Sequence, residues 1–206
     1  MPNHIYNRLT VVEGDYDLEN VKSFNDVIPM PQELKDTPHS GASMQVEQCL
    51  GITKSFFGGR PTINEVYSEN DKEEVDNLID NYIKYGHTTW YGWSTENWGT
   101  KWDMYGRDCD KNTLTFQTAW RTPVEWYKEF AKTLPDGVII KVEYASEDFG
   151  YHTGLFELSI DGVVEHEFAG GSFEAKTLAV LLQGLEDDVK LINNEWVWVD
   201  DIEDEE

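Results

Sequence analysis

The sequence has very little cysteine and no long apolar run. Cys49 and Cys109 are its only cysteines, too few for a disulfide framework or a CxxC metal site, and this usage is typical of a reducing compartment. No stretch approaches the roughly 18 apolar residues that a membrane span requires. Met1 is not followed by the basic segment and apolar run of a secretory leader. We therefore expect a cytoplasmic protein with no membrane association.

Basic residues are also scarce. The chain has 16 Lys and Arg against 40 Asp and Glu, which gives a formal net charge of −24. Such a charge opposes attraction to phosphate backbones and anionic lipids, so direct nucleic-acid binding is not expected. It suits a partner protein with a basic surface, and it also suits simple solubility.

Aromatic residues are abundant, by contrast. They make up 13% of the 206 residues, including eight Trp. Each large ring buries much area on packing, so the chain is long enough and apolar enough to form a sizeable core. This composition excludes a wholly disordered chain and favours a single domain with an insertion.

Hydrophobic periodicity predicts the elements of an α+β fold. Strands are expected at 5–12, 114–120, 138–144, 155–160, 163–168 and 196–199. Helices are expected at 16–27, 44–50, 65–85, 123–134 and 173–185, with Ser172 and Thr122 as N-caps of the last two, whereas 28–34 is expected to be extended. In the strand at 114–120, Leu114, Phe116, Thr118 and Trp120 should share one face.

These elements predict an antiparallel sheet with helices on one face. We assign residues 1–168 to one domain that carries an insertion at about 35–64. Residues 169–206 then form an extension with a helix, a strand and an acidic tail.

The densest group of aromatic residues lies between Trp90 and Tyr105. Its rings cannot all face water, so one interpretation is a structural loop that closes one end of the domain. The other is a pocket for a partner or ligand, with Trp90 or Trp93 as a stacking face and polar neighbours as anchors. The candidate binding residues are Trp90, Trp93, Glu96, Asn97, Trp98, Lys101, Trp102 and Asp103.

This stretch resembles a family signature, W-Y-x-W-x-x-E-N-W-G-T-K-W-D-x-Y. The signature belongs to phage- and plasmid-borne proteins with a YubB-type ferredoxin-like domain. The resemblance continues in order through about half of the chain, at 1–4, 7–11, 28–34, 116–123 and 144–154. It implies a ferredoxin-like sandwich and a mobile-element origin, but no catalytic residues. Residues 41–64 and those from 173 onward fall outside it.

Catalytic and metal sites are weakly indicated. Glu96 with Asp103, or Glu147 with Asp148, could supply the carboxylate pair of a hydrolase, but such pairs arise by chance in an acidic chain. In Glu165-His166-Glu167, a strand would place the histidine on the face opposite the two acids, which disfavours a metal site. We assign no catalytic residue, no cofactor and no metal.

Three functions therefore remain open. The first is a mobile-element accessory protein that binds a host protein, such as a defence or regulatory factor. The second is an acidic mimic of nucleic acid that occupies the basic groove of a DNA-binding enzyme. The third is a small-ligand or carbohydrate-binding or hydrolysing protein that uses the Trp-rich stretch. The net charge disfavours a further function, nucleic-acid binding by the aromatic face of the sheet.

Overall fold

A computed structural model describes residues 3–54 and 59–203. Contacts divide the chain into two compact units, Met1–Ile28 with Trp98–Glu206, and Pro29–Asn97. The predicted insertion at 35–64 lies within the second unit, and the predicted extension at 169–206 lies within the first.

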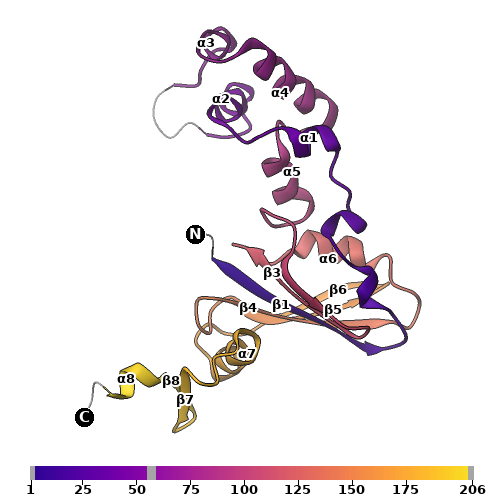
Figure 1. The fold of residues 1–206 in the computed structure, drawn as a ribbon, viewed down its shortest axis with the longest axis vertical. Coiled ribbons are helices and arrows are strands. Elements are labelled where there is room, and N and C mark those ends of the chain that lie inside the picture. Colours follow the sequence, from indigo (N-terminus) through magenta and orange to yellow (C-terminus); the bar gives the residue numbers. More distant parts are fainter. Residues whose placement is uncertain (1–2, 55–58, 204–206) are drawn as a thin grey trace. The chain divides into compact units, whose positions relative to one another are not determined.

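The first unit is built on a six-stranded sheet with the order β2-β3-β1-β4-β5-β6, and every neighbouring pair is antiparallel (Figure 1). The connection β3-α6-β4 leaves β1 between its two strands, which is a split β-α-β unit. The strands are β1 (His4–Glu13), β2 (Tyr105–Cys109), β3 (Thr113–Ala119), β4 (Ile139–Ser146), β5 (Thr153–Ser159) and β6 (Gly162–Glu167). The predicted α+β class is confirmed.

Alternation along the strands places the core on the face that α6 (Val124–Ala131) covers. Inward-facing residues from four strands pack under the aromatic side chains of this helix. The strand residues are Ile5, Leu9, Leu114, Phe116, Val142, Tyr144 and Phe156, and the helix residues are Trp126, Tyr127 and Phe130, all at most 1% exposed.

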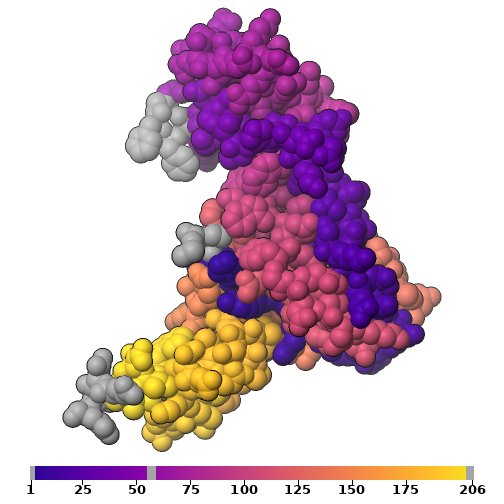
Figure 2. All heavy atoms as spheres, in the orientation of Figure 1, coloured from indigo at the N-terminus to yellow at the C-terminus, as the bar shows by residue number. Residues whose placement is uncertain are grey.

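The helix α7 (Phe173–Gln183) packs mainly against β4. It lies over the other face of the sheet, where Ala145 and Thr153 are buried, and so adds a helix to the face that the sequence left uncovered. Its predicted cap is confirmed, since the Ser172 side chain accepts a hydrogen bond from the Ala175 amide. In Figure 2 the atoms of α7, β7 (Val189–Ile192), β8 (Glu195–Trp198) and α8 (Val199–Glu203) form one packed block.

Two predicted segments of the first unit differ from the structure. The expected helix at 16–27 is replaced by two 3-10 turns, Leu18–Asn20 and Phe24–Asp26. Asp17 and Ser23 cap these turns with their own side chains, and such local bonds compete with a continuous helix. Thr122 does not cap α6, because its hydroxyl lies 3.1 Å from Nε2 of His152 instead.

The second unit is helical. It contains α1 (Gln32–Asp36), α2 (Gly41–Leu50), α3 (Ile63–Glu69), α4 (Lys72–Tyr85) and α5 (Trp90–Asn97). Apolar residues of α2, α3 and α4 form its core: Ala42, Val46, Val66, Val75 and Leu78. Among the described residues, no helix combines the length and apolar content that crossing a membrane requires.

Three predictions for this unit were wrong. The helix expected at 65–85 is two helices: α3 ends at Glu69 with Asn70 as its C-cap, and Asp71 starts α4 by accepting from the Glu73 and Glu74 amides. Residues 28–34 are not extended throughout, since α1 begins directly after Pro31. The aromatic stretch expected as a loop starts with the helix α5.

Candidate functional site

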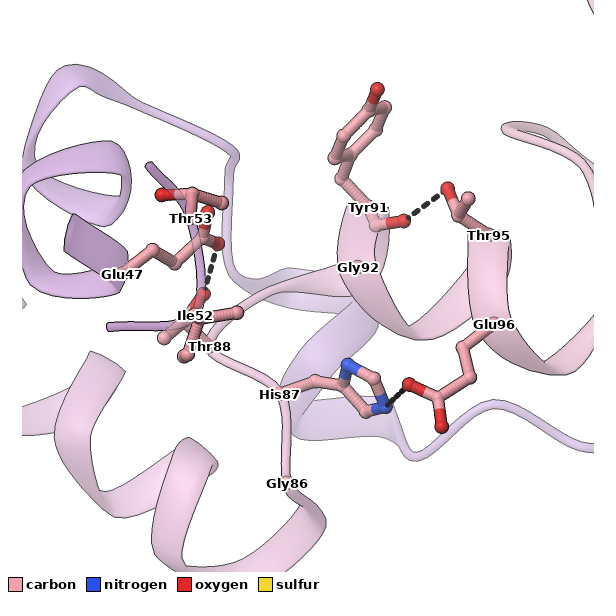
Figure 3. Close-up of a pocket in the computed structure, with 10 residues that line it drawn as sticks. All are labelled: Glu47, Ile52, Thr53, Gly86, His87, Thr88, Tyr91, Gly92, Thr95 and Glu96. Carbon is pink, nitrogen blue, oxygen red and sulfur yellow. Dashed lines mark hydrogen bonds and ion pairs between the residues drawn. The ribbon is translucent and has the colours of Figure 1, made fainter. Parts of the chain in front are cut away.

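A cavity of about 340 Å³ lies within the helical unit (Figure 3). Its walls come from α2 and the residues after it, from the turn that ends α4, and from α5. Most of the lining surface is apolar. The lining residues are Glu47, Ile52, Thr53, Gly86, His87, Thr88, Tyr91, Gly92, Thr95 and Glu96.

Glu47 is the most deeply placed charged group of this cavity. It follows the core residue Val46 on α2 and is only 8% exposed. The Thr88 hydroxyl donates a 2.6 Å hydrogen bond to its Oε1. Its Oε2 receives no hydrogen bond from the described residues. Since no buried side-chain oxygen or nitrogen of the described residues lacks a partner, this Oε2 is open to the cavity and can accept a hydrogen bond from a ligand there.

A second carboxylate reaches the cavity from the opposite side. Glu96 of α5 lies 3.3 Å from Nε2 of His87, and their side chains are 75% and 15% exposed. Gly86, with φ of 75°, ends α4 and turns the chain toward His87. Gly92 allows the close approach of α5, because a Cβ there would lie 3.2 Å from Nδ1 of His87.

This arrangement favours the binding of a cation with an apolar body. The cavity contains two carboxylates, and no lysine or arginine is among the described residues that line it. A metal ion is not suggested, since in the described part of the chain no three His, Cys, Asp or Glu side chains are grouped to hold one.

A different kind of surface lies in the sheet-containing unit. The Lys101 ammonium lies 4.8 Å from the Trp102 ring centroid and 5.0 Å from that of Trp120. The two indoles are 39% and 52% exposed. Trp120 has φ of 68°, which is strained for so bulky a residue. We call Lys101, Trp102 and Trp120 the indole surface.

Neighbouring residues support the indole surface from one side. The Tyr105 ring contacts that of Trp102, with centroids 6.4 Å apart, and its hydroxyl lies 2.8 Å from Nδ1 of His4. Burial raises the pKa of Tyr105, and the nearby charges of Glu147 and Tyr6 raise it further. The phenol therefore remains neutral at physiological pH and keeps its hydrogen bond with His4.

The eight predicted binding residues divide between the two units. Trp90, Trp93, Glu96 and Asn97 lie on α5 of the helical unit, and of these Glu96 lines the cavity. Trp98, Lys101, Trp102 and Asp103 belong to the sheet-containing unit.

Several of these residues have structural roles. Trp98 is 4% exposed and donates from Nε1 to the Ile28 carbonyl at 3.0 Å. Asp103 accepts hydrogen bonds from the Phe24 amide, the Ser23 hydroxyl and the Met104 amide.

The two predicted tryptophans of α5 are buried to different degrees. Trp93 is 7% exposed, and the Asn97 amide donates back to the Trp93 carbonyl at 2.9 Å. Trp90 is half-buried and meets Tyr91 edge-on, with ring centroids 5.7 Å apart.

The carboxylate pairs considered for hydrolysis have other partners. Glu147 accepts from the His4 amide at 2.9 Å, and Asp148 accepts from the Asn3 side chain at 3.2 Å. Glu165, which was considered only as a metal ligand, lies on the edge strand β6 and accepts from the Tyr144 hydroxyl at 3.2 Å. Glu147 and Asp148 thus bind residues at or directly before the start of β1, and Glu165 binds a residue of β4, so all three have structural partners.

Comparison with known proteins finds a similarity for part of the sheet-containing unit. Residues 97–192 match the family model described as a ferredoxin-like domain in Api92-like protein. The predicted ferredoxin-like fold is thereby confirmed. The matched part of this ferredoxin-like domain contains the whole indole surface but not β1, the strand that lies between β3 and β4. No curated protein and no solved structure matches the chain.

Sequence reasoning missed Glu47, His87 and Trp120 as site residues. Glu47 and Thr88 are separated by 41 positions, so no local pattern could pair them. Trp120 was expected to continue the buried alternation of β3. The strand ends at Ala119, and the positive φ of the next residue turns the indole outward.

Proposed function

We propose that this protein works by binding another protein, and that the indole surface is part of the contact. The observation that carries the proposal is the pair of exposed indoles, Trp102 and Trp120, whose ring centroids lie 4.8 Å and 5.0 Å from the Lys101 ammonium. A folded protein rarely leaves two large neighbouring rings in water without a use for them. Tryptophan is also enriched among the residues that dominate binding energy at interfaces.

The backbone at Trp120 supports this interpretation. A tryptophan in the left-handed region costs of order 1–3 kcal/mol, and such strain concentrates at functional positions. The strained residue here is the more exposed of the two indoles. A side chain that contributed only to folding would gain nothing from being held outward at this cost.

The net charge indicates the kind of partner. A protein with a charge of −24 attracts basic surfaces from a distance, and this raises the rate of encounter. We infer a partner with a basic surface around a groove that receives the indoles. Because its sequence blocks resemble those of YubB-type proteins, we further infer a mobile-element accessory protein whose partner is a host defence or regulatory factor.

The test is affinity capture by the tagged full chain from a lysate of its native cells, at low and high salt, read by mass spectrometry. The decisive variant combines Trp102→Ala with Trp120→Asn, because asparagine tolerates the positive φ of position 120. The matched control is Ile83→Ala, which removes a side chain that is 76% exposed but lies on α4.

We expect a partner that the wild-type chain and the Ile83→Ala variant retain. Its capture should fall at least about tenfold with the double variant, which should unfold at the same urea concentration as the wild type. Equal capture by the double variant would contradict the proposal. If the double variant captured the partner as well as the wild type at low salt, and both lost the partner at high salt, acidic mimicry of nucleic acid would become the preferred function.

A further inference from the structure

The cavity of the helical unit has the features of a ligand site that is independent of the indole surface. We propose that it binds an alkyl guanidinium group, with Glu47 as the buried anchor and Glu96 as the anchor at the rim. The proposal rests on the Glu47 carboxylate, whose Oε2 has no partner among the described residues, and on the Glu96 carboxylate across the cavity.

The charges of the lining select a cation. Two carboxylates face a cavity whose remaining lining is mostly apolar, and Figure 3 shows them entering from opposite sides with His87 between them. Charge interactions strengthen where water is partly excluded, so an anion would be repelled more strongly here than on an open surface. A neutral ligand would leave the free oxygen of Glu47 without a charged partner.

The shape and hydration of guanidinium suit this cavity better than those of an ammonium ion. Guanidinium carries donors along several edges of one plane, so it can meet acceptors on opposite sides at once. It is also more weakly hydrated than ammonium, and it loses less on entering a mostly apolar cavity. Its alkyl chain would contact Ile52 and the apolar parts of Thr88 and Thr95.

The Glu47 anchor is preorganised for this role. The Thr88 hydroxyl holds Oε1 at 2.6 Å, and Thr88 is itself only 2% exposed. The carboxylate therefore does not need to reorient when a ligand arrives, which reduces the entropic cost of binding. Glu96 contributes charge at the rim, where solvent weakens its effect.

The probe is N-acetyl-L-arginine amide, titrated into the full chain and followed by amide and side-chain NMR shifts. N-acetyl-L-citrulline amide has nearly the same shape without the charge, and N-acetyl-L-lysine amide carries an ammonium group. We expect the arginine probe to bind with a Kd on the order of 0.1–1 mM, as is usual for so small a ligand. Shifts should concentrate at His87, Thr88 and Gly92.

Three variants give the proposal its test. Glu47→Gln keeps an acceptor for Thr88 and should weaken the arginine probe at least about tenfold, whereas Glu96→Gln should weaken it about threefold. Glu73→Gln removes the same charge from α4 outside this cavity and should leave the affinity unchanged. Absence of saturable shifts, equal affinity for the citrulline probe, or wild-type affinity in Glu47→Gln would each overturn the proposal. Equal affinity for the lysine probe would overturn the choice of guanidinium.

A second pair of probes separates the two sources of the ligand. Butylguanidine represents a free small molecule, and a short peptide with one central arginine represents a side chain of a partner protein. Tighter binding of the peptide would assign the cavity to a partner's arginine, and equal or tighter binding of butylguanidine would assign it to a small guanidine. Loss of partner capture in the indole variant would not affect either titration, so the two proposals fail separately.

Discussion

The Tyr127 hydroxyl donates a 2.9 Å hydrogen bond to Oδ1 of Asn7, and both side chains are buried beneath α6. The amide nitrogen of Asn7 donates in turn to the Ile5 carbonyl and to the Thr118 hydroxyl. Every polar atom of this small group thus has a partner inside an otherwise apolar core. Burial and the nearby Tyr144 raise the pKa of Tyr127 well above its ordinary value, so the phenol stays a donor.

Tyr127→Phe should therefore destabilise the protein although it removes a single oxygen atom. The change leaves Oδ1 of Asn7 buried without a donor, which costs about 1–3 kcal/mol in free energy of unfolding. Urea denaturation followed by circular dichroism measures this loss. Tyr151→Phe is the matched control, since Tyr151 is 60% exposed and should change stability by less than about 0.5 kcal/mol. Equal stability of both variants would mean that water replaces the lost donor.

A second prediction concerns Glu143, which pairs with Arg8 at 2.7 Å and with Lys141 at 3.0 Å. Burial alone would raise the pKa of Glu143, but the hydrogen bonds and charges of Arg8 and Lys141 outweigh burial and lower it. A carboxyl group with a lowered folded-state pKa stabilises the fold above its unfolded-state pKa. That contribution is lost as the pH falls through the folded-state value.

The wild type should therefore lose more stability than Glu143→Gln between pH 7 and about pH 3. Urea denaturation at a series of pH values gives the two curves. At pH 7, Arg8→Met should cost about 1–3 kcal/mol, because it leaves a largely buried carboxylate with one cation in place of two. Parallel pH curves for wild type and Glu143→Gln would show that this ion pair does not contribute to acid sensitivity.

A third prediction concerns Gly154, where β5 passes close to its neighbours. A Cβ at this position would lie 2.6 Å from the His166 carbonyl oxygen and 2.8 Å from the Tyr144 hydroxyl. Gly154→Ala should thus destabilise the sheet by about 1–3 kcal/mol through overpacking. Gly41→Ala is the control, since nothing lies within 4 Å of the added atom and the position opens α2. Thermal unfolding should leave the control unchanged or slightly more stable.

The strands of the core were predictable from the sequence, because a pleated strand with one buried face alternates residue by residue. Leu114, Phe116 and Thr118 show this pattern and are buried as expected. The alternation carried no information about where the strand stops. Trp120 fits the same alternation in the sequence, but its ring is exposed because the backbone turns at that residue.

The helix α5 and the cavity beside it were not predictable in the same way. Tryptophan, tyrosine and glycine are poor helix formers, and α5 shows no clear apolar face in its sequence. Tertiary packing, including contacts with α1, determines its conformation. The cavity joins Glu47 to residues at 86–96, and this long-range pairing follows from the packing of α2 with α4 and not from any motif.

The last prediction separates the structural tryptophans of the aromatic stretch from the exposed ones. Trp98→Ala should cost about 3–5 kcal/mol, because it empties a buried site against Phe24 and removes the hydrogen bond to the Ile28 carbonyl. Trp102→Ala should cost less than about 1 kcal/mol, since that indole is 39% exposed and its contact with Lys101 lies at the surface.

Urea denaturation of both variants checks this difference, and it decides how binding experiments should be designed. Variants that remove Trp93 or Trp98 would lose a partner through damage to the fold, because both rings are buried. Only variants of exposed rings can report on an interface. If Trp102→Ala unfolded as readily as Trp98→Ala, the indole surface would be part of the packing of the domain, and loss of a partner in its variants would carry no evidence for binding.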